Sequence, residues 1–309
     1  MEEILLDLKN VRKQYANFSL ECSMQVKRGS ITGLIGANGA GKTTILHTIS
    51  GLIAPKKGSI TFEGQEITKI PAHKIVENGL AQVPEGRRVF PSLSVLQNLK
   101  LGAYTRKDKK EIDDTLKMIY ERFPRLEERK NQPAGTLSGG EQQMLAMGRA
   151  LMSKPRIILM DEPFSALDPM TRRTLQQEVR TLQQKLNKTF VFVTHDMAEA
   201  LDLADVIIFM DHGRIVQMAP PEEMLAHPAS GLIQDFLGKF INTPSHKALT
   251  AADFMRTGVY TVSTRKGINE CISKMQRHNV DTLIVVDDQA RYQGTVSIAD
   301  IRLTGHVVK

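Results

Sequence analysis

The sequence predicts an α/β protein with a parallel sheet at its centre and a second, smaller α/β unit after it. Strand-length apolar runs alternate with helix-like segments over residues 1–235, a pattern that is typical of successive βα units. One of these strands leads through a glycine-rich loop directly into a helix. A shift in composition then separates residues 248–305, which show a strand and helix pattern of their own.

The composition is that of an ordinary globular protein. Of its 309 residues, 41% are apolar and 24% are charged, which excludes a disordered chain, a collagen-like repeat and a polytopic membrane protein. The longest apolar runs, such as Val206–Met210, fall far short of the ~20 residues that cross a bilayer. The acidic start, Met1–Asp7, is unlike a secretory signal, so we expect no export. A net charge of +7 suits an anionic partner, which could be a nucleotide, a nucleic acid or an acidic membrane surface.

The strands of the first unit come from continuous apolar runs. Ile31–Ile35 precedes the glycine-rich loop, and Ile45–Ile49 has the apolar positions of a buried helix. Arg156–Met160 and Thr189–Val193 are apolar almost throughout, as in central strands that are covered on both faces. We therefore predict that these runs are the core of a parallel sheet.

The helices are predicted from the spacing of Leu, Val and Met. This spacing is helical over Thr171–Leu186 and over Met197–Leu203. Residues 92–150 are charged and contain no good strand, so they are predicted to form a helical subdomain with a solvated charge run at 106–111.

The chain after the first unit is predicted to be a linker and a small domain. Glycine, proline and small polar residues over 236–247 favour a linker. The following residues, 248–305, pattern as strands, a helix and a turn. The predicted elements are strands at Val259–Val262, Thr282–Val286 and Tyr292–Val296, a helix at Ile268–His278 and a short helix from Ser297.

The glycine-rich loop has the spacing of a phosphate-binding loop. Gly36 is followed by four residues and then by Gly41, Lys42 and Thr43. Glycines let the backbone N–H groups turn toward phosphate oxygens, and the helix adds the positive end of its dipole. Lys42 can reach the β- and γ-phosphates, and the Thr43 hydroxyl can hold Mg²⁺. A chance Lys-Thr after a glycine-rich turn is the alternative.

Two carboxylates end the strand that begins at Arg156. Asp161 is placed to reach a metal ion, and Glu162 to polarise the water that attacks the γ-phosphate. An exposed turn after an ordinary strand would give the same pattern, but the phosphate loop in the same chain favours the catalytic interpretation.

At this point the chain resembles the ATPases of ABC transporters. Leu137–Gln143 is similar to their signature motif, Ser165–Asp168 to their D-loop and Thr194–Asp196 to their switch-histidine loop. Tyr15 stands where the family places an adenine-stacking ring, although a strand residue packed on the sheet is the alternative. His195 could likewise be an ordinary strand-end histidine.

The resemblance implies a site that binds ATP and Mg²⁺. Catalysis is then assigned to Glu162 and His195, and the metal to Thr43, Glu85 and Asp161, with Glu85 standing where most members have glutamine. The nucleotide-binding residues that it implies are Tyr15, Gly36, Asn38, Gly39, Gly41, Lys42, Thr43, Thr44, Ser138, Gly139, Gly140 and Asp168.

The type of transporter is indicated differently by the two ends of the ATPase. Residues 82–95 and 134–146 resemble ATPases of branched-chain amino-acid importers, whereas 160–169 and 193–201 resemble those of glycine betaine, carnitine and choline importers. Residues 248–305 resemble a single CBS domain, which osmoprotectant importers often carry. We therefore expect an osmoprotectant importer, with a branched-chain importer as the alternative and a soluble, non-transport ABC ATPase as a remote one.

The resemblance also implies partners. They are membrane permease subunits, a second ATPase copy arranged head to tail as a homodimer or heterodimer, and, indirectly, an external solute-binding protein. An adenine nucleotide is a candidate ligand of the CBS tail, with a response to ionic strength as the alternative, and the Ser297-x-x-Asp300 pattern is also that of an ordinary helix cap. Nucleic acid is not expected as a partner, and the chain is expected to lie on the cytoplasmic face of the membrane as a peripheral protein.

Overall fold

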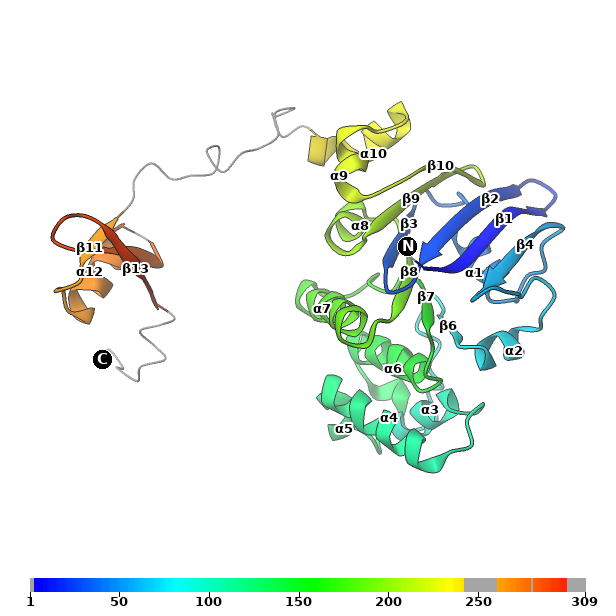
Figure 1. Cartoon of the computed structure of the whole chain (residues 1–309). Coiled ribbons are helices and arrows are strands. Elements are labelled where there is room, and N and C mark those ends of the chain that lie inside the picture. Colours follow the sequence, from blue (N-terminus) through cyan, green and yellow to red (C-terminus); the bar gives the residue numbers. More distant parts are fainter. Residues whose placement is uncertain (1–2, 242–259, 279, 299–309) are drawn as a thin grey trace. The chain divides into compact units, whose positions relative to one another are not determined.

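The computed structural model describes residues 3–241, 260–278 and 280–298 (Figure 1). The chain divides into two compact units, Met1–Pro244 and Ser245–Lys309. Each unit is described by itself.

The first unit is built on a sheet whose central strands are parallel. In sheet order these strands are β9 (Val206–Asp211), β3 (Ile31–Ile35), β8 (Thr189–Thr194), β7 (Ile157–Asp161) and β6 (Leu80–Val83). Every residue of β3, β7 and β8 is buried. The prediction of central strands covered on both faces is therefore confirmed.

The sheet continues beyond β9 with strands that the apolar runs did not predict, and these pair antiparallel except for the parallel pair of β10 and β2. These are β10 (Arg214–Ala219), β2 (Ser19–Lys27), β1 (Ile4–Gln14), β4 (Lys57–Phe62) and β5 (Gln65–Glu66), and together they make a ten-stranded mixed sheet. Along β2, buried and less buried residues alternate, because one face of such a sheet packs on the core while the other meets water. The sheet is thus mixed, not wholly parallel as expected.

Helices cover the central strands on both faces (Figure 1). The helix α7 ends at the predicted residue and begins two residues early, and α8 has the predicted bounds. One buried cluster joins α7 and α8 to the sheet, and a second lies under α1 and α2. The bounds are α1 (Lys42–Ile49), α2 (Ala72–Glu77), α7 (Pro169–Leu186), α8 (Met197–Leu203) and α9 (Pro221–Ala226).

The segment between β6 and β7 is helical, as predicted for residues 92–150, and contains no strand. Most of the charge run at 106–111 is solvated, but the guanidinium of Arg106 is turned inward and donates hydrogen bonds to the Thr115 hydroxyl and the Met152 carbonyl. The bounds are α3 (Val95–Gly102), α4 (Lys109–Arg122), α5 (Pro124–Glu128), the 3₁₀ turn η1 (Ala134–Thr136) and α6 (Gly139–Leu151).

The predicted linker at 236–247 begins too early. The helix α10 runs over Gly231–Ile241. Leu237 is fully buried, and the ring of Phe236 packs edge-on against Phe209 with their centroids 5.1 Å apart. This apolar contact keeps the helix on the first unit, so the composition shift at residue 236 does not end that unit. The remaining predicted linker, 242–247, lies outside the described residues.

In its described residues, 260–278 and 280–298, the second unit has a three-stranded sheet and one complete helix. The strand β12 (Thr282–Val286) pairs in parallel with β11 (Thr261–Ser263) and antiparallel with β13 (Tyr292–Ser297), and α12 (Ile268–His278) packs on them. The predicted helix and both later strands are confirmed, whereas the first strand begins and ends later than predicted. Val259 and most of the short helix after Ser297 lie outside the described residues.

Candidate nucleotide site

The phosphate loop lies between β3 and α1 and requires glycine at two positions. Gly41 has a φ of 102°, and a Cβ there would come within 2.7 Å of the Phe18 ring. A Cβ at Gly36 would come within 2.2 Å of the Met210 carbonyl oxygen. Any other residue would push the loop away from its neighbours, so the glycine spacing in the sequence reflects a tightly curled backbone.

Lys42 is held inside this curl. Only 6% of the residue is exposed, and its Nζ donates hydrogen bonds to the carbonyls of Gly36 (2.8 Å) and Ala37 (3.0 Å). Burial lowers the pKa of Lys42, while the carboxylates of Glu162 and Asp161 oppose that effect. The lysine is therefore a nearly buried cation beside the loop's backbone N–H groups, as a phosphate-binding site needs.

Two of the residues expected to hold Mg²⁺ come together from the first turn of α1 (Thr43) and the carboxyl end of β7 (Asp161). The Thr43 hydroxyl donates a hydrogen bond of 3.2 Å to Asp161 Oδ1. Burial raises the pKa of Asp161, the bond from Thr43 lowers it, and the nearby charge of Glu85 raises it further. Hydroxyl and carboxylate oxygens are the ligands that Mg²⁺ prefers.

This donor set fits a magnesium ion shared with phosphates. In the described part of the chain, no three His, Cys, Asp or Glu side chains gather as a metal cage. Mg²⁺ is usually bound by one or two protein oxygens together with substrate phosphates and water. Thr43 and Asp161 supply such a pair.

Glu162 and His195 face each other across two strand ends. Glu162 follows β7 and has a φ of 45°, and His195 follows β8. The distance from His195 Nδ1 to Glu162 Oε1 is 3.1 Å. A left-handed backbone is unfavourable for glutamate, so the fold holds this carboxylate in place at a cost.

Lys42, Thr43, Glu162 and His195 line one cavity of about 1140 Å³, which Asp161 does not line. The predicted residues that line it are Gly36, Asn38, Gly39, Gly41, Lys42, Thr43, Thr44, Glu85, Glu162 and His195. Residues that the sequence reasoning missed also line it, namely Asn17, Phe18, Asp211, His212 and Phe236. A loop of one strand-loop-helix unit thus meets the ends of β7 and β8 and the helix α10 at one place.

Tyr15 does not line this cavity. It lies at the start of a turn in which its backbone N–H donates to the Phe18 carbonyl, and the two rings are 6.1 Å apart. The ring of Phe18, three residues later, is the one that borders the phosphate loop. A second aromatic residue in the same turn was the signal that could have found it.

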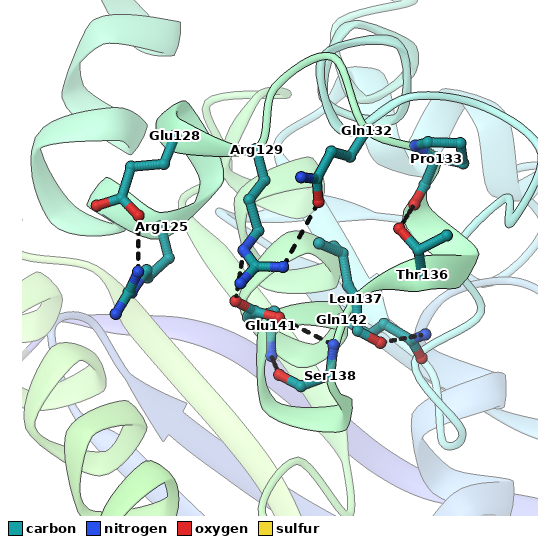
Figure 2. A network of polar contacts seen from close by, with 10 residues as sticks. All are labelled: Arg125, Glu128, Arg129, Gln132, Pro133, Thr136, Leu137, Ser138, Glu141 and Gln142. Atoms are coloured by element: carbon teal, nitrogen blue, oxygen red, sulfur yellow. Dashed lines mark hydrogen bonds and ion pairs between the residues drawn. The ribbon is translucent and has the colours of Figure 1, made fainter.

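The signature residues also lie outside the cavity. Ser138 caps α6 through a reciprocal pair of bonds with Glu141, and Arg129 pairs with that carboxylate at 3.1 Å (Figure 2). The guanidinium of Arg87 packs over Gly139 so closely that a Cβ there would lie 2.8 Å from it, and Gly140 packs on Thr171. The start of α6 is therefore held by several contacts, although its residues do not line the phosphate loop's cavity.

Asp168 serves locally as a helix cap. Its carboxylate accepts hydrogen bonds from the backbone N–H groups of Met170 (3.1 Å) and Thr171 (3.0 Å), and bonding from Thr171 and Met170 lowers its pKa. It does not line the nucleotide cavity. The role implied for it by the resemblance stays a prediction.

Comparison with known proteins agrees with this arrangement. The family model described as ABC transporter matches residues 20–165, and the CBS domain model matches residues 251–304. The choline transport ATP-binding protein OpuBA of Bacillus subtilis (strain 168) is 35% identical over 303 residues, covering 95% of this chain and 78% of the relative. The chain belongs to the ABC transporter family. It is an ATP-hydrolysing subunit coupled to transport, with a CBS domain after the ATPase.

Two other relatives differ in how much of the chain they match. The glycine betaine/carnitine/choline transport ATP-binding protein OpuCA of Bacillus subtilis (strain 168) is 36% identical over 303 residues, covering 95% of this chain and 78% of the relative. The high-affinity branched-chain amino acid transport ATP-binding protein BraG of Pseudomonas aeruginosa is 43% identical over 208 residues, covering 67% of this chain and 88% of the relative.

Solved structures show the same fold. An ATP-binding cassette of an ABC transporter in its ADP conformation has a TM-score of 0.67 and 26% identity, covering 75% of this chain and 98% of that one. A nucleotide-free cassette has a TM-score of 0.68 and 25% identity, with the same coverage of both chains. Within the described residues, no helix combines the length and the apolar character needed to cross a bilayer.

Proposed function

We propose that this subunit energises the uptake of a quaternary-amine osmoprotectant of the glycine betaine, carnitine and choline class. The observation that supports it is the extent of similarity: the relatives named for choline and for glycine betaine, carnitine and choline transport match 95% of the chain, whereas BraG matches 67%. The CBS match at 251–304 adds to this, since a CBS tail after the ATPase resembles the architecture expected of osmoprotectant importers.

Uptake by cells tests the solute class. A strain that lacks its own importers is given the chain together with a candidate permease and solute-binding protein, and labelled choline, glycine betaine and leucine are supplied separately. We expect ATP-dependent uptake of choline or glycine betaine and none of leucine. Uptake of leucine alone would favour the branched-chain alternative. Uptake of none of the three solutes by a strain whose ATPase is active would favour the non-transport alternative.

In the proposed site, Lys42 and the backbone of the phosphate loop hold the phosphates of ATP. Thr43, Asp161 and Glu85 hold Mg²⁺, which neutralises phosphate charge when bound. Glu162 accepts a proton from the attacking water, and His195 stabilises the charge that develops on the γ-phosphate. The supporting observation is that Glu162, His195, Lys42 and Thr43 line one cavity.

Replacement of Glu162 tests the assignment of the general base. Glu162→Gln keeps the shape of the side chain but cannot accept the proton, so we expect ATP hydrolysis to fall by about 10²-fold or more while ATP binding is retained. Single-turnover hydrolysis and binding of a labelled nucleotide measure the two effects separately. Turnover at the wild-type rate in this variant would show that another group is the base.

The permease subunits are proposed to dock in a groove of the helical subdomain. A cavity of about 670 Å³ is lined by the exposed rings of Phe90 and Tyr104 and by Leu101 and Arg149. The Arg149 guanidinium lies 5.3 Å from the centroid of the Phe90 ring. The segment from Glu85 to Phe90 runs from the nucleotide cavity to this groove, which suits an element that couples ATP to a partner.

The second copy and the cell location follow from the same proposal. Ser138, Gly139, Gly140 and Asp168 are proposed to complete the ATP site of a second ATPase subunit, arranged head to tail, as a homodimer or heterodimer. The assembly is proposed to lie on the cytoplasmic face of the membrane, and the CBS tail is proposed to regulate it, with an adenine nucleotide as the candidate ligand. Titration of the full chain, with the phosphate loop inactivated, tests that ligand.

A further inference from the structure

The turn that carries His195 is tied down by one buried hydroxyl. Thr194, at the end of β8, is 2% exposed, and its Oγ1 donates a hydrogen bond of 2.6 Å to Glu199 Oε2. The same oxygen accepts a hydrogen bond of 3.0 Å from the backbone N–H of Asp196. The Thr194 hydroxyl therefore fixes the chain on both sides of His195: Thr194 is held by Glu199, and Asp196 is held by Thr194.

Glu199 is not explained by the needs of its own helix. It lies in the first turn of α8 and is only 7% exposed. The helix is already capped by Asp196, whose carboxylate accepts a hydrogen bond of 2.9 Å from the N–H of Ala198. Burying a carboxylate is costly unless it is bonded, and burial raises the pKa of Glu199.

Arg172 of α7 approaches the same turn from the other side. Its Nε lies 3.7 Å from Glu199 Oε1, and one terminal nitrogen lies 3.9 Å from Asp196 Oδ2. The carboxylates of Asp196 and Glu199 thus both face the guanidinium of Arg172. This contact links α7, the helix that Asp168 caps, to the segment that holds His195.

A second, smaller cavity of about 110 Å³ lies at this network. Glu162 and His195 line it as well as the nucleotide cavity. Glu162 and His195 therefore border two spaces: the nucleotide cavity, and the smaller cavity lined by Thr194, Arg172 and Glu199.

The orientation of the His195 ring depends on this turn. Sixty per cent of its side chain is exposed, so packing around the ring contributes little to holding it. Its Nδ1 nevertheless lies 3.1 Å from Glu162 Oε1. A backbone turn that is fixed on both sides of His195 limits the directions in which the ring can point.

We propose that Thr194 and Glu199 are positioning residues for hydrolysis, which hold His195 against Glu162. This inference rests on the roles proposed above for Glu162 and His195. Neither Thr194 nor Glu199 lines the nucleotide cavity, so their effect passes through the His195 turn and not through ATP binding.

Thr194→Val tests the proposal, because valine has nearly the shape of threonine but neither donates to Glu199 nor accepts from Asp196. We expect kcat for ATP hydrolysis to fall by about tenfold, since a catalytic group moved by a fraction of an ångström loses much of its effect, with KM for ATP within about twofold of wild type. Thr194→Ser, which keeps the hydroxyl, is expected to restore kcat. Glu199→Gln is the second variant and is expected to lower kcat in the same direction.

Thr189→Val is the matched control at the other end of β8. The Thr189 hydroxyl is also buried and accepts a hydrogen bond of 2.8 Å from the backbone N–H of Gly29. This variant loses a buried bond of the same kind far from His195, so we expect a similar fall in thermal stability and a wild-type kcat. Equal kcat values for the two valine variants would overturn the proposal.

A double-mutant cycle with His195→Ala shows whether the effect passes through the histidine. We expect Thr194→Val to lower kcat in the wild type but to change it less than twofold in the His195→Ala background, because coupled residues are not additive. A full, additive loss in that background would overturn the inference alone. Unchanged kcat in His195→Ala by itself would instead overturn the role proposed for His195.

Discussion

Two helix N-termini in the first unit are built for opposite surroundings. The helix α1 begins inside a cavity: its glycine loop curls around the start of the helix, and Lys42 is almost fully buried. The helix α6 begins with Ser138, which is exposed and bonded only within its own turn and to the neighbouring Arg129–Glu141 pair. The start of α1 lines a cavity that can enclose phosphates within a single chain, whereas the start of α6 lies at an exposed serine outside that cavity. The proposed head-to-tail arrangement would use this difference, because the second terminus would then meet a nucleotide that is held by another copy.

Replacement of Lys42 has the largest expected effect and tests whether the start of α1 binds the phosphates of ATP. Lys42→Ala removes the buried cation that faces the phosphates, and we expect ATP affinity to fall by about 10²-fold or more, as for a hydrogen-bonded charge lost from a buried site. Equilibrium binding of a fluorescent ATP analogue measures it. Lys56→Ala, at an exposed lysine, is the control and should bind as the wild type does.

Mixing two inactive copies tests the outward-facing terminus. A Lys42→Ala copy and a Gly139→Asp copy are each expected to be inactive as homodimers, the second because the added Cβ would crowd the Arg87 guanidinium and the added carboxylate would repel phosphate. In a head-to-tail heterodimer one of the two sites keeps both an intact phosphate loop and an intact signature, so we expect hydrolysis to return to roughly half per dimer at most. No recovery in a co-purified heterodimer would contradict the composite site.

Asp161→Asn separates stability from function at the enclosed site. Burial raises the pKa of Asp161, so its ionised form disfavours the folded state, and this cost is present at neutral pH and disappears as the carboxyl protonates in acid. We expect the asparagine variant to be more stable than the ligand-free wild type at pH 7, with no gain at pH 3. Urea unfolding at the two pH values measures it, and hydrolysis should be lost.

Removing the cap of α6 has the smallest expected effect on stability. Ser138→Ala takes away the hydroxyl that bonds the N–H of Glu141, which costs about 1 kcal/mol. Thermal unfolding of the chain without nucleotide measures this. Thr136→Ala, whose hydroxyl bonds only the Pro133 carbonyl nearby, serves as the control. A fall in the hydrolysis rate of Ser138→Ala under conditions in which the variant remains folded would show that Ser138 also acts on a nucleotide.

The sequence predicted the central strands and most of the nucleotide cavity because both depend on local patterns. Apolar runs mark β7 and β8, and the loop from Gly36 to Thr44 carries its geometry in its glycine spacing. Contacts between distant segments leave no such pattern. The ring of Phe18 over Gly41, the guanidinium of Arg87 over Gly139 and the inward Glu199 arise from tertiary packing.

The misplaced end of the first unit and the unpredicted strands have the same origin. Composition placed the end of the first unit at residue 236, but Phe236 packs on Phe209 and α10 continues. The antiparallel strands escaped prediction because their alternation of buried and exposed residues is a weaker signal than an unbroken apolar run. Whether a segment belongs to a folded unit depends on the residues from distant parts of the chain that pack against it, and a single sequence does not show these contacts.

The buried charges of Lys42 and Asp161 have a consequence for the life of the protein in a cell. Each is held where water cannot reach it well, and phosphates and Mg²⁺ would be their natural counterions. A ligand that binds only the folded state protects that state by mass action. We therefore expect the empty subunit to be the form that proteases degrade first. Its abundance should then fall when a cell runs short of ATP, before any change in its synthesis.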